Sequence, residues 1–155
     1  PLARETRTFS SAGSGVCLAS SASGNGFNCA GIGSTSGTAT TADVLDGRGV
    51  FQGGVILPGL DLMRLSLARD TAQLPYTDGR FEHMPRRTAD AIQTGCLHAQ
   101  LGAIERMFRL VAAEPGSLCL LNGGAAASLA PLLECPLREV DNLVLEGLAR
   151  MLMPD

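Results

Sequence analysis

The sequence predicts an α/β fold in which a mixed sheet carries flanking helices. Strands 40–45 and 50–56 flank the turn Asp46-Gly47-Arg48-Gly49, and Asp-Gly supplies the positive φ that a short hairpin loop requires. Two helical segments follow, and then a short apolar strand runs into a glycine turn and two further helices. This order is that of one half of an actin-like, sugar-kinase-type (RNase H-like) fold. Such a half-fold needs additional strands, so it is predicted to be incomplete at the N-terminus.

Apolar periodicity predicts the first two helices. From Leu60 to about Ala72 the apolar face consists of Leu60, Met63, Leu67 and Thr71. Residues 75–86 contain two prolines and Asp78-Gly79, which predict an irregular loop. A long helix is expected from Ala89 to Ala112, with Thr88 as its N-cap. Its predicted apolar stripe is Ile92, Cys96, Ala99, Ala103, Met107 and Leu110.

The remaining elements follow a helix break at Pro115-Gly116. Residues 117–121 form a short apolar run that is typical of a buried strand. Asn122-Gly123-Gly124 then opens a predicted helix at 125–133, which gives the strand, glycine turn and helix of a nucleotide-contacting crevice. A last helix is predicted at 143–152, with Asp141 or Asn142 as its cap.

Residues 1–36 differ in composition from the predicted domain at 37–155. They are rich in Ser, Gly, Ala and Asn, with scattered apolar residues and no helix or strand period. We expect coil or weak order here, because so little apolar area does not offset chain entropy. A miscalled or frame-shifted segment is one hypothesis for this composition.

Composition limits the possible functions of the 155-residue chain, which has room for one ordinary domain. A net charge of −3 gives no electrostatic case for binding nucleic acid or an anionic membrane, and no apolar run is long enough for a membrane span. Five cysteines, an odd number without close spacing, argue against a disulfide scaffold, and two histidines do not make a zinc site. Reduced thiols and a cytoplasmic location are therefore expected, with Cys96 and Cys119 filling the core.

Two glycine-bracketed segments are the best candidates for ligand contact. In 37–43, Gly37 precedes the hydroxyl residues Thr38, Thr40 and Thr41, a combination that suits a loop holding phosphate oxygens. The second segment, 53–59, precedes a helix whose N-terminus attracts anions. Both segments are equally compatible with plain hairpin or strand-to-helix connections.

These segments and those after them resemble a known family. The sequence runs through GTATTADVLD (37–46), GGVILPGLDLMR (53–64), RTADAIQTG (87–95), Asn122-Gly123-Gly124 and LVLEGL (143–148). Over about 37–152 this order resembles the C-terminal half of type III pantothenate kinase, also known as the Bvg accessory factor family. The resemblance implies transfer of the ATP γ-phosphoryl group to pantothenate, the first step of coenzyme A synthesis, with Mg²⁺ and a monovalent cation (K⁺ or NH₄⁺).

The resemblance also identifies what this sequence lacks. The family's Asp-x-Gly-Asn-Thr phosphate loop and its Gly-x-Asp-Arg segment, whose Asp is the catalytic base, do not occur. The family's cation-binding Asp corresponds to Thr35. No catalytic residue and no protein metal ligand are therefore assigned, and the chain by itself is expected to be inactive.

The resemblance implies roles for six residues. Gly37 and Thr38 correspond to the ATP-contacting loop, and Asn122, Gly123 and Gly124 to the adenosine-side turn. Thr88 corresponds to the pantothenate-contacting threonine. Each has a structural alternative: a solvated turn, a strand-to-helix turn, or a helix cap. Asp43 faces a metal–phosphate group in one reading and is a solvated strand carboxylate in the other.

Two alternatives to an enzyme remain open. One is a non-catalytic regulatory fragment that acts through apolar faces, and the other is a nucleotide-binding module without turnover. The family's dimeric arrangement implies a homodimer, and the two apolar helix stripes agree with self-association.

Overall fold

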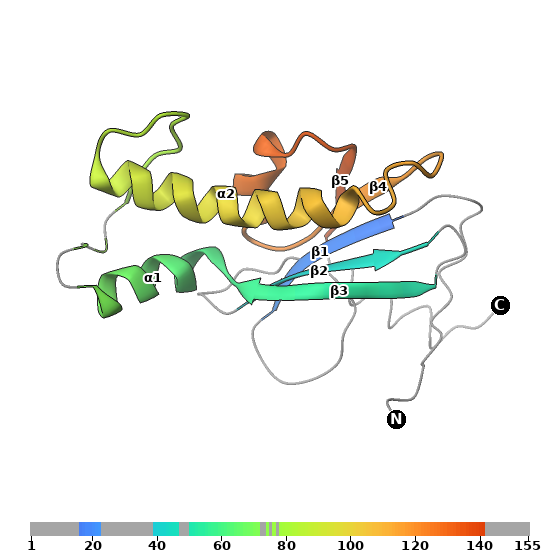
Figure 1. The fold of residues 1–155 in the computed structure, drawn as a ribbon, viewed down its shortest axis with the longest axis horizontal. Helices are drawn as coiled ribbons and strands as arrows, with labels where there is room; N and C mark the ends of the chain where they lie inside the picture. The colour runs from blue at the N-terminus through green and yellow to red at the C-terminus, as the bar shows by residue number, and fades with distance from the viewer. Residues whose placement is uncertain are drawn as a thin grey trace, which may run out of the picture.

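A computed structural model describes residues 16–22, 39–46, 50–71, 74, 76 and 78–141, with 16–22 described by backbone only. Their core is a five-stranded mixed sheet with helices packed on it (Figure 1). The strands are Val16–Ala22 (β1), Ala39–Leu45 (β2), Phe51–Pro58 (β3), Leu118–Leu121 (β4) and Leu137–Glu139 (β5). The helices are Leu60–Asp70 (α1), Thr88–Phe108 (α2) and Ala126–Leu129 (α3), followed by the 3₁₀ turn Ala130–Leu132 (η1). The prediction of a mixed α/β fold is confirmed.

Strand β1 is the central strand of the sheet, whose order is β3-β2-β1-β4-β5. It pairs antiparallel with β2 and parallel with β4, and β4 pairs parallel with β5. The expectation of coil is therefore wrong at 16–22, and the segment supplies a strand after all. A weak β pattern is sufficient here because the neighbouring strands on both sides satisfy the backbone hydrogen bonds of β1. Local β propensity does not include this contribution from neighbouring strands.

The hairpin predicted at 40–45 and 50–56 is present as β2 and β3. Val50 N donates to the Asp46 carboxylate at 3.0 Å, and Asp46 N donates to Val50 O at 3.0 Å, so Asp46 closes the hairpin. Its turn residues 47–49 lie outside the described residues. The second glycine segment, 53–59, is not a turn: 53–58 belong to β3, and only Gly59 stands at the start of α1. The apolar run 55–57 continues the ladder with β2.

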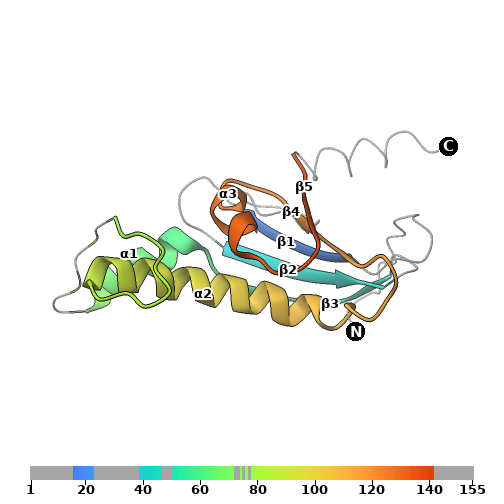
Figure 2. The same ribbon diagram turned by 90° about the horizontal axis from the view of Figure 1, so that it is seen from above.

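Helix α2 lies along one face of the sheet, and α1 lies beside its N-terminal half, beyond the end of the strands (Figures 1 and 2). The long helix begins at Thr88, so Arg87 and not Thr88 is its N-cap, and no side-chain hydrogen bond caps it. It ends at Phe108 rather than Ala112. Leu110 N bonds to Met107 O and Val111 N to Phe108 O, so the chain tightens into i→i+3 turns.

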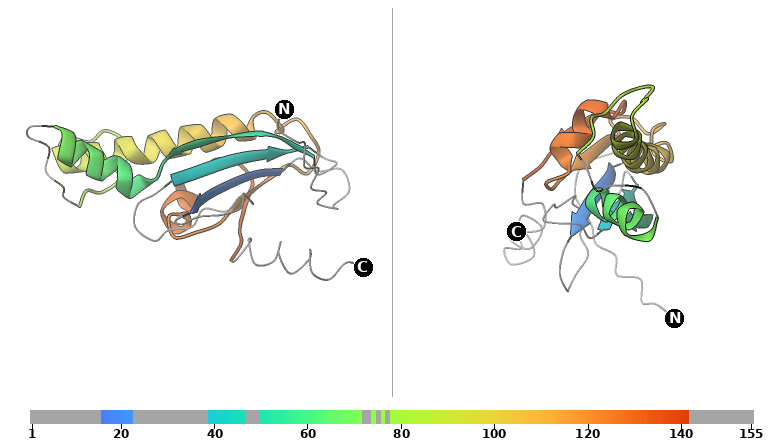
Figure 3. Two further views of the ribbon diagram at one scale, coloured as in Figure 1. Left: turned by 90° about the horizontal axis from the view of Figure 1, so that it is seen from below. Right: turned by 90° about the vertical axis from the view of Figure 1, so that its left-hand side faces the viewer.

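The helix predicted at 125–133 is divided into α3 and η1, on the same face of the sheet as α2 (Figure 3). Pro131 is the reason, since its ring fits the first turn of a new helix and not the interior of a continuing one. The helix predicted at 143–152 and its cap Asn142 lie outside the described residues. Within the described part of the chain, no helix combines the length and apolarity needed to cross a bilayer.

The core lies between the sheet and α2. On β2 the side chains alternate, with Thr40, Ala42 and Val44 buried, and Cys119 and Leu121 of β4 are fully buried beside them. From α2 the buried apolar residues over the sheet are Leu97, Leu101, Ile104 and Phe108. The predicted stripe is correct at Ile92 and Cys96 but wrong at exposed Ala99 and Leu110. In the C-terminal half of the helix the buried face is the neighbouring stripe, Leu101, Ile104 and Phe108, whose side chains are larger.

Two buried polar side chains of α2 hold the loop that precedes it. Arg80 N donates to the Asp90 carboxylate at 3.0 Å, and Glu82 N donates to the Thr94 hydroxyl at 3.1 Å. Gly79 packs so closely that a Cβ there would lie 2.1 Å from Ala89 O. Hydrogen bonds from Arg80 and Glu82 therefore hold the predicted irregular loop along the N-terminal part of α2.

Replacing Asp90 with alanine should lower the free energy of unfolding by about 1–3 kcal/mol, because the Arg80 N–H loses its acceptor in a partly buried position. Urea denaturation measures the change. Asp70→Ala is the matched control, since Asp70 only pairs with Arg69 on the surface and its loss should leave the midpoint nearly unchanged. Equal effects of the two substitutions would contradict the anchoring role of Asp90.

Candidate functional site

The described residues next to the two segments predicted to contact ATP lie at one end of the sheet. Strand β2 begins at Ala39, directly after Gly37 and Thr38, and β4 ends at Leu121, directly before Asn122. Ala39 pairs with Ala22 and Leu121 with Ala19, so Ala39 and Leu121 both lie toward the carboxyl end of β1. Gly37 and Thr38 themselves lie outside the described residues. This end of the sheet is the candidate site, since ligands of α/β sheets bind beyond the carboxyl ends of strands.

The Asn122-Gly123-Gly124 turn has a structural role that the sequence did not reveal. The Asn122 amide donates to Val140 O, and Val140 N donates to Leu121 O at 2.9 Å, so the end of β4 is tied to the chain after β5. Gly123 has φ +104°, a conformation that favours glycine, and its carbonyl accepts from Ala126 N at 2.8 Å. The turn therefore presents its backbone at the candidate site, while the Asn122 side chain holds it in place.

The start of α1 lies at the same end of the sheet, because Pro58 pairs with Ala39. Its N-cap Gly59 is buried and makes no side-chain cap, and the first turn contains Asp61. The negative charge of Asp61 offsets part of the positive charge at the helix N-terminus. This terminus therefore attracts an anion less than the sequence pattern predicted.

Gln100 is a site-adjacent residue that the sequence analysis missed. It is 1% exposed, and its Nε2 donates to Pro58 O at 2.6 Å and to the Met63 sulfur at 3.6 Å. The side chain thus fixes the β3–α1 junction beside the candidate site. A pattern was available in the sequence: Gln100 is a polar residue between Leu97 and Leu101 on the buried face of the helix.

Thr88 is not brought to the same place. It is exposed at the first residue of α2, and Gln100 marks the level of the sheet end along that helix. At 1.5 Å per residue, Thr88 lies about 18 Å beyond Gln100. Thr88, the predicted pantothenate contact, therefore lies on the projecting α1–α2 pair, whereas the Asn122–Gly124 turn lies at the end of the sheet.

Asp43 is half-buried on the face of β2 opposite to the buried side chains of Ala42 and Val44. The Thr41 hydroxyl approaches its carboxylate at 3.5 Å. Burial raises the pKa of Asp43, and the Thr41 hydrogen bond offsets part of that rise. Gly54 on β3 leaves room for the Asp43 side chain, because a Cβ on residue 54 would lie 2.0 Å from the Asp43 Oδ1. Asp43 is thus packed against its neighbour strand and is not a freely solvated carboxylate.

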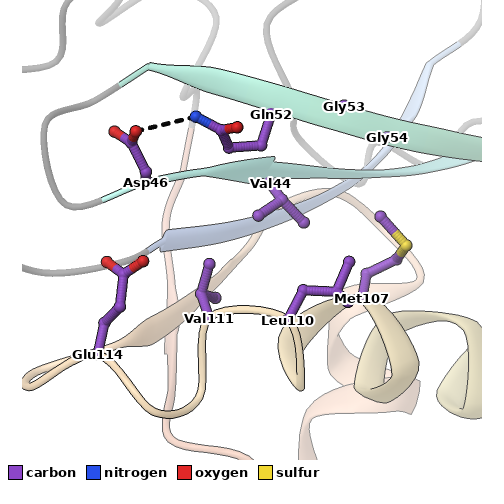
Figure 4. A pocket seen from close by; sticks show the side chains of 9 residues that line it. All are labelled: Val44, Asp46, Gln52, Gly53, Gly54, Met107, Leu110, Val111 and Glu114. Carbon is purple, nitrogen blue, oxygen red and sulfur yellow. Dashed lines mark hydrogen bonds between the residues drawn. The ribbon is translucent and has the colours of Figure 1, made fainter.

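A cavity of about 500 Å³ lies at the opposite end of the sheet (Figure 4). Val44, Met107 and Val111 form its apolar wall, and Asp46 and Glu114 carry its acidic groups. Asp46 is engaged with Gln52, whose Nε2 donates to it at 2.9 Å. The cavity contains none of the residues predicted to contact ATP or pantothenate, so it is separate from the candidate site.

Metal ligands are sparse in the described part of the chain. It holds no group of three or more His, Cys, Asp or Glu side chains arranged to bind a metal ion. Mg²⁺ in phosphoryl transfer needs only one or two carboxylates plus phosphate oxygens, and here Asp43 is the one acidic residue on β2 itself. A single packed carboxylate is not a built metal site, and Thr35, which we predicted to stand at the family's cation position, lies outside the described residues.

Comparison with known proteins places these features in one family. The family model of type III pantothenate kinase matches residues 17–110, which includes 17–36, a segment that we expected to be unmatched. The type III pantothenate kinase of Aromatoleum aromaticum is 63% identical over 113 residues, 73% of this chain and 47% of that protein. That of Azoarcus sp. (strain BH72) is 55% identical over 115 residues, 74% of this chain and 44% of that protein.

A solved structure shares the fold. The crystal structure of a Campylobacter jejuni protein, described as a Baf family transcriptional activator, superposes with a TM-score of 0.58 at 19% identity. The superposition covers 90% of this chain and 57% of that one. The chain spans about half the length of the curated relatives that it matches. Because the family model matches more than half of its residues, the chain belongs to the type III pantothenate kinase family.

Proposed function

We propose that this chain forms the C-terminal, nucleotide-contacting half of an enzyme that phosphorylates pantothenate with ATP. Two register pairs support the proposal. Ala39, the residue after Thr38, pairs with Ala22 of β1, and Leu121, the residue before Asn122, pairs with Ala19 of β1. The strand order β3-β2-β1-β4-β5, antiparallel on one side of β1 and parallel on the other, supports an actin-like (RNase H-like) half-fold.

The chemistry assigned to these residues is positioning. Phosphoryl transfer needs alignment of ATP, charge neutralisation and a carboxylate near the attacking hydroxyl. Thr38 and the backbone at Gly37, Gly123 and Gly124 would align ATP, and Thr88 would contact pantothenate on the projecting helix pair. Mg²⁺ and a monovalent cation, when bound, would neutralise phosphate charge. No step is assigned to a base, because the sequence contains no Gly-x-Asp-Arg segment.

The alternative function is nucleotide binding without turnover, or regulation by a non-catalytic fragment. Two observations favour it: the missing motifs, and the separation of Thr88 from the sheet end. We further propose a cytoplasmic homodimer. Exposed apolar residues support self-association, among them Leu65 on α1, 49% exposed, and Ile56 on the edge strand β3, 77% exposed.

The chain alone should show negligible pantothenate kinase activity. Loss of a catalytic base costs about two to four orders of magnitude in rate. A coupled ADP-release assay with pantothenate and ATP measures it. Turnover near about 1 per second, an ordinary kinase rate, would contradict the assignment.

Thr38→Val should shrink the thermal stabilisation that ATP gives the chain. The substitution keeps the side-chain shape but removes the donor, and a hydrogen bond to a charged group contributes about 1.5–3 kcal/mol. The melting temperature without nucleotide should change little. Differential scanning fluorimetry with and without ATP tests this, and Ser128→Ala on α3 is the control. An equal shift in Thr38→Val, or none in the parent chain, would show that the loop is only a connection.

The chain should self-associate at micromolar concentration, and Leu65→Glu should weaken the association by placing a charge in the apolar contact. Analytical ultracentrifugation across a dilution series measures it. Ser128→Glu, at an exposed position of α3, is the control. A monomer at every concentration would contradict the homodimer.

A further inference from the structure

Two cysteines that are distant in the sequence lie together in the core. Cys119 on β4 is fully buried, and Cys135, just before β5, is partly buried against the same cluster. Cys119 N donates to Pro136 O at 2.8 Å, which fixes the chain at 135–136 beside Cys119. In the parallel pairing of β4 with β5, Cys119 stands opposite Leu137, two residues after Cys135, and the interaction with Cys119 raises the pKa of Cys135. Both side chains are in the reduced thiol form.

We propose that Cys119 and Cys135 form a modification site at which a peroxide-class oxidant produces an intramolecular disulfide. Cys135 is the more accessible thiol and would react first. Peroxide transfers one oxygen to its sulfur, giving a sulfenic acid and one molecule of water or alcohol. The Cys119 sulfur then attacks the Cys135 sulfur, the S–O bond breaks, and water leaves with the Cys119 proton. The pair is oxidised by two electrons and the peroxide is reduced by two.

The surroundings of the pair make this reaction slow at neutral pH. The hydrogen bond with Cys119, together with burial, raises the pKa of Cys135. Glu105 of α2 acts in the same direction, and it is held nearby because Glu134 N donates to its carboxylate at 3.3 Å. Glu105 also pairs with Arg109 at 3.9 Å. Since the thiolate is the reactive form, oxidation should accelerate as the pH rises.

The disulfide would close the segment 119–135, which contains the Asn122–Gly124 turn and α3. The Asn122 amide already ties the start of this segment to Val140. A covalent link at its other end would restrict the segment in the unfolded chain and raise the melting temperature, by about 5–10 °C for a loop of this size. The modification would therefore act on the element that borders the candidate site.

Peptide mass spectrometry of the full chain tests the proposal. The chain is treated with hydrogen peroxide at about pH 8.5, near the pKa of an ordinary thiol, alkylated after denaturation and digested with trypsin. Cleavage after Arg109 and Arg138 leaves both cysteines on peptide 110–138. That peptide should lack two hydrogens and carry no alkyl group, and dithiothreitol should restore both alkylation sites. Further cleavage after Glu134 should leave 110–134 and 135–138 joined until reduction.

Two controls make the result specific. Cys135→Ser should leave Cys119 fully alkylated, and Cys96→Ala should leave the cross-link intact, because buried Cys96 lies on another tryptic peptide. In strand register Cys119 also pairs with Cys17 of β1. A cross-link between peptides 8–48 and 110–138, complete alkylation of peptide 110–138 after oxidation, or an oxidised chain without a higher melting temperature would each overturn the proposal.

Discussion

The packing of α2 against β2 is the contact on which the rest of the structure depends. Leu101 and Ile104 of the helix belong to one buried cluster with Ala42 of β2 and Leu121 of β4, and all four are nearly or fully buried. Burial of such side chains stabilises the fold by about 1.5–3 kcal/mol for each large residue. Because the helix is fixed along the strands, its N-terminal half must project past the end of the sheet beside α1 (Figure 1). The position of Thr88 follows directly from that geometry.

The same helix connects the core to the candidate site. Gln100 stands in the buried face of α2, where an apolar residue would fit the pattern, and its amide reaches the carbonyl of Pro58. The buried Gln100 amide thus satisfies this backbone carbonyl, and the contact fixes the β3–α1 junction to the helix. On the other side of β1, the Asn122 amide holds the end of β4 in the same manner. Both anchors are amide side chains that position backbone at one sheet end.

Local sequence determined most of the elements. Asp46-Gly47 produced the hairpin, apolar periodicity produced α1 and α2, and the run 117–121 produced β4. Motif order also identified the family, since several short segments in one order are far more specific than any one of them. The residues of a turn such as Asn122-Gly123-Gly124 are visible in sequence because glycine marks a backbone conformation that other residues avoid.

Tertiary structure alone decided the rest, because those features depend on neighbours that are distant in sequence. Residues 16–22 have weak strand propensity, yet two ladders make them the central strand. The choice between two apolar stripes on α2 was decided by which side chains filled the space over the sheet. Cys119 and Cys135 lie near each other only because β4 and β5 are paired. Sequence by itself determined elements and family, whereas packing decided which residues lie near one another. Ala39 at the start of β2 and Leu121 at the end of β4 lie at the same end of the sheet, and Thr88 lies on the helix pair that projects beyond it.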